Sequence, residues 1–181
     1  MQQTVGATHQ TMAKIGATAR NEMATAFAAF DAIGLAASER LSAIAGVIAA
    51  TVAKRHAVAP TRFLGAIQDM MRPAIGRTGE PCTASAADAR PAHIADGVRV
   101  LDAALDRLAQ HLTAAGLPGD EAAFVERVFL ARLLSAYRPQ AIRTTLLAVG
   151  RAVARPGYCC GDPVHLAEAE AVPAADVAAA T

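Results

Sequence analysis

The first third of the chain carries one uninterrupted pattern of small and apolar residues. The stripe comprises Met12, Ile15, Ala19, Met23, Ala26, Phe30, Ile33, Ala37, Leu41, Ile44, Ile48 and Val52. Its members are three or four residues apart, an average of about 3.6 residues per step, which is the α-helical period. The phase holds across Gly34 and the Ser38-Glu39 stretch, where such a helix could break. We therefore expect one long N-terminal helix, straight or kinked at Gly34.

Proline divides the remainder of the chain into shorter segments. The first 59 residues contain no proline, whereas nine prolines follow from Pro60 onward. Because proline disrupts the interior of a helix, only short helices are expected there. Pro60 and Thr61 open a predicted helix over residues 62–71, with Thr61 as its N-cap, and Pro73 and Gly76 end it. Residues 76–91 are small, polar and rich in proline and glycine, which indicates a linker.

Three further amphipathic or apolar segments follow the linker. Ile94, Val98, Leu101, Leu105, Leu108, Leu112 and Ala115 form a helical stripe that ends at Gly116 and Pro118. Residues 120–137 are apolar on most sides, so we expect this helix to be central, and residues 139–154 form the third. The predicted class is all-α, with a long N-terminal helix and a small C-terminal helical bundle.

This pattern divides the chain into four parts. Residues 1–75 hold the long and short helices and form an association region, and residues 76–91 are the linker. Residues 92–155 are a three-helix unit. Residues 156–181 are expected to contain a turn, a short helix beginning at Asp162-Pro163, and a weakly ordered acidic tail.

Composition supports a helical protein and excludes several other classes. Alanine accounts for 47 of the 181 residues, aromatic residues for 4%, and the net charge is only +1. Three cysteines are too few for a disulfide scaffold, the high apolar content argues against a charged disordered chain, and β-branched and aromatic residues are too sparse for a β-sandwich. Alanine buries little area, so an alanine-rich, coiled-coil-like chain gains from an oligomer or another partner.

The sequence also bears on location. No basic region precedes Lys14, so we expect no signal peptide. The longest uncharged apolar run, Leu41–Ala53, has 13 residues and is too short to span a membrane. An odd number of cysteines fits a reducing compartment, and we expect a cytoplasmic protein. No motif for phosphate binding, for a nucleophilic serine or for a di-iron centre occurs, so we expect neither a cofactor nor catalysis.

The leading hypothesis is a non-enzymatic helical interaction or assembly protein. The N-terminal stripe would bind a second copy, another helical protein or an apolar particle. Its larger residues, namely Met23, Phe30, Ile33, Leu41, Ile44 and Ile48, are the predicted contacts. In the alternative interpretation, the same stripe packs on the second half of the chain within one molecule.

A second hypothesis is a helical accessory subunit that binds nucleic acid. Six arginines and no acidic residue lie between Arg127 and Gly161. Arg143, Arg151 and Arg155 share one helix face, where they would contact phosphates. The alternative is a solvated face that the protein's own acidic residues neutralise.

A third hypothesis is a metal or redox site. Cys159, Cys160 and His165 lie close together in the sequence, near Asp162. Thiolate and imidazole are ligands for soft or borderline metals, and two adjacent cysteines could form a redox pair. Adjacent cysteines do not have the spacing of structural zinc sites, however, and incidental cysteines in a loop are the alternative.

Overall fold

A computed structural model describes residues 2–56, 60–75 and 90–154, with side chains for 11–56, 62–71 and 90–153 except 140. Within these ranges the chain forms six α-helices and no strand, so the predicted all-α class is confirmed for this part. The helices are α1 (Gln2–Ile33), α2 (Ala37–Arg55), α3 (Pro60–Ile75), α4 (Pro91–Ala114), α5 (Gly119–Ser135) and α6 (Pro139–Ala154).

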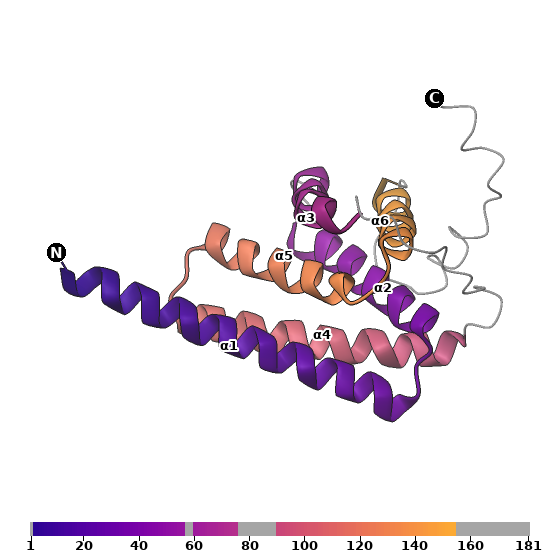
Figure 1. The fold of residues 1–181 in the computed structure, drawn as a ribbon, viewed down its shortest axis with the longest axis horizontal. Helices are drawn as coiled ribbons and strands as arrows, with labels where there is room; N and C mark the ends of the chain where they lie inside the picture. Colours follow the sequence, from indigo (N-terminus) through magenta and orange to yellow (C-terminus); the bar gives the residue numbers. More distant parts are fainter. Residues whose placement is uncertain (1, 57–59, 76–89, 155–181) are drawn as a thin grey trace.

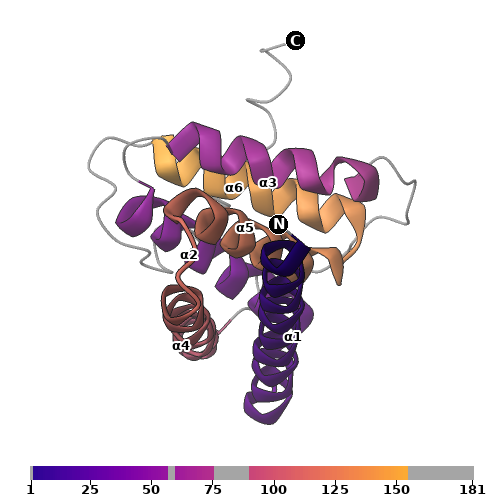
Figure 2. The same cartoon turned by 90° about the vertical axis from the view of Figure 1, so that its left-hand side faces the viewer.

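The helices lie in two layers with α2 between them. On one side, α1 and α4 lie antiparallel, and α5 runs in the same direction as α1 (Figure 1). On the other side, α3 and α6 lie next to each other and cross the direction of α1 and α4 (Figure 2). The N-terminal end of α1 extends beyond α5 (Figure 1).

The central helix is α2, whereas the sequence pattern predicted that residues 120–137 would be central. Every residue of α2 from 43 to 52 is buried, and the helix packs against α3, α4, α5 and α6. Many of these residues are alanines, whose small side chains allow neighbouring helices to approach closely. Helix α5 contacts α1, α2, α3 and α4, but it keeps an open face on which Phe124 is 49% exposed.

The predicted continuation of the N-terminal helix across Gly34 is wrong, because the chain breaks between Ile33 and Ala37. Gly34 has a φ of 73°, a conformation that glycine adopts readily. The Gly34 amide donates to the Asp31 carbonyl and the Leu35 amide to the Phe30 carbonyl, both at 3.0 Å. These two bonds form a Schellman motif, which satisfies the last carbonyls of α1. The same arrangement ends α4, where Gly116 has a φ of 67°.

The apolar phase continues across the break because both helices bury the same stripe and both pack on α4. Helix α2 also contacts α3, α5 and α6, because it turns into the centre of the molecule. Leu35, in the turn itself, is buried with the core and packs beside Phe30. The same apolar spacing therefore continues through two separate helices rather than one continuous helix.

A buried carboxylate fastens this turn to the start of α4. Glu39 is 1% exposed and accepts a hydrogen bond from the Ala36 amide at 2.8 Å. It also accepts bonds from the backbone amide, Nε and Nη2 of Arg90 at 2.9, 2.9 and 3.0 Å. The Arg90 hydrogen bonds hold the pKa of Glu39 at about 2, below its ordinary 4.5, and they outweigh the opposing effect of burial.

The remaining helices follow the sequence prediction with small shifts at their ends. Helix α3 begins at Pro60 and continues past Pro73 to Ile75, so Pro73 does not end this helix as the sequence predicted. Helix α5 begins at Gly119, one residue before the predicted start. Residues 76–89 of the predicted linker and the whole predicted tail lie outside the described residues. No described helix is both long and apolar enough to cross a membrane.

The helices share one hydrophobic core, and α4 approaches its neighbours closely at Gly97. A Cβ atom at this position would lie 2.8 Å from Leu35 Cδ2 and 2.9 Å from Ala43 Cβ. Distances below 3.0 Å require a neighbour to move, and the Ala43 methyl is fixed to the backbone of α2. Gly97 therefore allows α4 to contact α2 and the turn after α1 at the same point.

We expect Gly97→Ala to lower the free energy of unfolding. The added methyl overpacks the contact at a cost of about 1–3 kcal/mol, which exceeds the gain of roughly 1 kcal/mol in helix propensity. Chemical denaturation followed by circular dichroism measures the difference.

Gly65→Ala in α3 is the matched control, because nothing lies within 4 Å of its added Cβ. This substitution should leave stability unchanged or raise it by up to about 1 kcal/mol. A stabilising effect of both substitutions would contradict the close approach at Gly97.

We expect stability to fall as the pH drops from about 4.5 to about 2. The pKa of Glu39 is lower in the folded state, so its ionised form stabilises the fold above the unfolded pKa of 4.5. That contribution is lost as the pH falls through the folded value. Glu39→Gln should cost about 2–3 kcal/mol at neutral pH and flatten this part of the pH profile.

Glu121→Gln serves as the control for this experiment, because Glu121 is exposed in the first turn of α5. Its effect at neutral pH should stay below about 1 kcal/mol. An unchanged pH profile in Glu39→Gln would show that this carboxylate does not carry the acid sensitivity.

Candidate docking groove

An open apolar groove of about 320 Å³ lies between α1 and α5. Its lining residues are Met12, Ile15, Gly16, Ala19, Arg20 and Met23 of α1, and Phe124, Val125, Val128, Phe129 and Arg132 of α5. Within each helix these positions are spaced by one, three or four residues, so they form one continuous face. The groove therefore lies between one face of α1 and one face of α5, which face each other without full contact.

The depth of the groove comes from small residues beside large ones. Gly16 and Ala19 leave room on α1, while Ile15 and Phe129 are buried and form the floor. Helix α1 packs mainly against α4 and touches α5 only lightly. The two helices therefore stay apart, and solvent reaches the side chains between them.

Large apolar side chains at the edges of the groove are exposed. Met12 is 41% exposed and Phe124 is 49% exposed. Among the residues whose burial is described, Leu147 of α6 is the other large apolar side chain with such exposure. Two of these three side chains thus belong to one surface, which distinguishes the groove from isolated surface residues.

Two arginines line the groove without a carboxylate partner. Arg20 and Arg132 take part in no ion pair within the described residues. The Arg20 guanidinium folds back over Gly16, where Nη1 lies 3.6 Å from the position that a Cβ would occupy. Helices α1 and α5 run in the same direction, and each arginine lies toward the C-terminal end of its lining segment, so both occupy one end of the groove.

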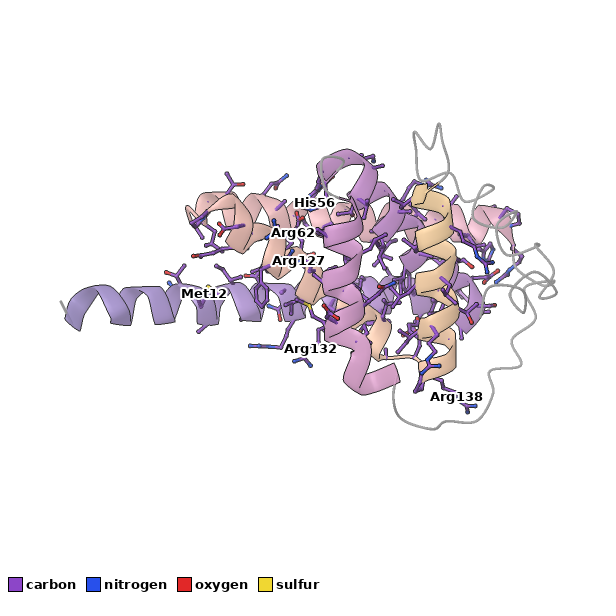
Figure 3. The ribbon with its side chains drawn as sticks, turned by 90° about the horizontal axis from the view of Figure 1, so that it is seen from above. Met12, His56, Arg62, Arg127, Arg132 and Arg138 are labelled. Atoms are coloured by element: carbon purple, nitrogen blue, oxygen red, sulfur yellow. The ribbon has the colours of Figure 1, made fainter. Side chains whose placement is uncertain are left out.

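Further positive charge follows α5 toward α3. Arg127 places its guanidinium carbon 5.9 Å from the centre of the Phe63 ring, and its buried Nε has no hydrogen-bond partner among the described residues. Arg62 of α3 is exposed and forms no ion pair in the described part of the chain. Figure 3 shows Arg62, Arg127 and Arg132 on the side of α3 that faces Met12.

Nearby carboxylates are held by other cations. Glu22 of α1 bonds to Arg107 at 2.8 Å. Glu126 of α5 is buried, and its Oε1 accepts from Arg55 Nη1 at 2.6 Å. These pairs leave the arginines of the groove uncompensated. Glu121 is exposed in the first turn of α5, at the opposite end of that helix from Arg132.

The Glu126 cluster connects α2 and α3 to α5. His56 Nε2 lies 3.3 Å from Glu126 Oε2, and its ring stacks on Phe63 with 4.0 Å between ring centres. Arg55 also bonds to Asp106 of α4 at 2.5 Å. Through Arg55 and His56, Glu126 ties α5 to the end of α2 and to α3. These contacts hold the α5 side of the groove in place.

The predicted association residues are distributed over different surroundings. Phe30, Ile44 and Ile48 are 0% exposed in the core of this chain. Ile33 and Leu41 are partly buried against that core. A partner helix would have to displace this chain's own helices to contact the buried three.

Met23 alone among the predicted contacts lines the groove. Sequence reasoning missed Phe124, Val128 and Arg132, because it placed their helix at the centre of the bundle. The available signal was that residues 120–137 are apolar on most sides, since an apolar side chain on every face leaves one such face for a partner when the helix lies at the surface.

The residues of the other two hypotheses lie elsewhere. Arg143 and Arg151 are exposed on α6, with the 59% exposed Leu147 midway between them in the sequence. Arg155, Cys159, Cys160 and His165 lie outside the described residues. Within the described ranges, no three His, Cys, Asp or Glu side chains are grouped closely enough to hold a metal ion.

Comparison with known protein families, with curated proteins and with solved structures found no match for this chain.

Proposed function

We propose that the protein is a non-enzymatic interaction protein that binds an amphipathic helix of a partner protein in the groove between α1 and α5. The observation that carries this proposal is the joint exposure of Met12 and Phe124 over a buried apolar floor. Exposed apolar side chains gathered on one concave surface are typical of binding sites.

A helix fits this surface better than an extended peptide. The groove is bounded by two helices running in the same direction, so a third helix can insert a ridge of side chains between them. An extended peptide binds most readily to a free sheet edge, and the described residues contain no strand. The N-terminal part of α1 extends beyond α5 and offers further length along which a docked helix can lie.

The expected affinity is modest. Full burial of a large apolar side chain contributes roughly 1.5–3 kcal/mol, and both edge residues are already about half buried. Met12 and Phe124 together therefore contribute about 2–3 kcal/mol from this side of the interface. With a matching stripe on the partner, binding in the range of about 1–100 µM is expected.

A panel of labelled helical peptides tests the proposal. The peptides share one apolar stripe with leucine at helical spacing and differ only in their flanking residues. We expect at least one to bind, and Phe124→Asp to weaken that binding at least about tenfold because it places a charge in the apolar edge. Fluorescence anisotropy gives the dissociation constants.

Leu147→Asp is the matched control, since Leu147 is also a large apolar side chain, 59% exposed, but lies on α6. The peptide dissociation constant of Leu147→Asp should stay within about twofold of that of the unmodified chain. Absence of binding by every peptide would refute the proposal. A dimer in sedimentation that Phe124→Asp converts to monomers would instead identify a second copy as the occupant.

Nucleic acid is a second candidate partner, and the exposure of Arg143 and Arg151 on α6 favours it. Arginine contacts to phosphates release counterions, so such binding weakens steeply with salt. We expect Arg143→Glu with Arg151→Glu to abolish any binding of double-stranded DNA or RNA at low salt. Binding that is absent in the unmodified chain, or insensitive to salt, would exclude this candidate.

A further inference from the structure

The charges around the groove carry information about the partner beyond its apolar stripe. Arg20 and Arg132 lie at the same end of the groove, and neither is neutralised by a carboxylate in the described part of the chain. Two uncompensated cations beside an apolar surface disfavour a basic partner and favour an acidic one.

Neighbouring groups reinforce this asymmetry. Arg62 and Arg127 continue the positive surface from α5 toward α3, as Figure 3 shows. The carboxylates that could offset it, Glu22 and Glu126, are bonded to Arg107 and Arg55. Glu121 lies toward the other end of α5, so the positive charge is concentrated where Arg132 ends the groove.

We propose that the partner helix is acidic and docks with its carboxylates against Arg20 and Arg132. This inference rests on the proposed helix-binding function and adds the charge and the orientation of the partner. The apolar stripe of the partner covers Met12 and Phe124, while Asp or Glu residues near one end of its helix meet the two arginines. A phosphate polymer is a poorer match, because apolar side chains line most of the groove.

Three probe peptides with the same leucine stripe and with Glu, Gln or Lys flanks measure the preference. We expect the Glu probe to bind about fivefold more tightly than the Gln probe, as two exposed ion pairs would give, and the Lys probe to bind most weakly. The preference should shrink at high salt, because dissolved ions screen exposed charges.

Charge reversal assigns the preference to the groove. Arg20→Glu combined with Arg132→Glu should reverse the order of the three probes, and the corresponding Gln variants should remove the preference without reversing it. Arg99→Glu, on an exposed position of α4, is the control and should leave the order unchanged. The Gln variants keep the test decisive if the reversed chain folds poorly.

The outcomes separate this inference from the function on which it rests. If all three probes bind equally and Phe124→Asp abolishes this binding, the acidic preference is overturned and the helix-binding function stands. No binding of any probe would overturn both. A peptide of residues 156–181 can also compete with the labelled Glu probe for the groove. If it binds as tightly as the Glu probe, the proposal of a separate partner protein is overturned, and the groove is assigned to the acidic end of this chain.

Discussion

The reversal of the chain after α1 fixes where the other helices can lie. Gly34 ends α1, and the buried carboxylate of Glu39 joins the following turn to the start of α4 through Arg90. This arrangement directs α2 into the centre of the molecule, where it contacts four other helices. Without the reversal, a continuous N-terminal helix would leave the alanine-rich face of α2 uncovered.

The alanine content has different consequences in different helices. In α2, small side chains allow close contact on all sides, so a chain with few aromatic residues still forms a core. In α1, Gly16 and Ala19 face a helix that does not approach them, and the same smallness produces a hollow. Composition therefore contributes both to the packed interior and to the surface proposed to bind a partner.

Helical class and most helix positions could be predicted from the sequence, because apolar spacing and proline positions act locally. The break at Gly34 was missed although Leu35 follows Gly34 as Leu117 follows Gly116, and Gly116 with Pro118 was correctly interpreted as a stop. The unbroken phase concealed it, since both helices bury one stripe. The glycine that ends α1 was thus present in the sequence, but the continuous apolar spacing was given more weight than this glycine.

The candidate site was harder to predict because it depends on contacts between distant segments. Glu39 and Arg90 are 51 residues apart, and no local pattern pairs them. Met12 and Phe124 form one surface only because α1 lies beside α5, which periodicity within a single helix does not reveal. The buried positions of Ile44 and Ile48 likewise follow from the central place of α2.

The absence of a side chain at Gly97 has a consequence for the rotation of α4 about its own axis. Turning the helix by one residue would bring Asp96 or Val98 against the Ala43 methyl, where even a Cβ does not fit. The rotational setting of α4 is thereby fixed at Gly97, near its N-terminal end, and holds along the roughly 26 Å of helix that follow up to the turn before α5. A single missing methyl group thus helps to set which face of α4 is turned toward α2 and the turn after α1.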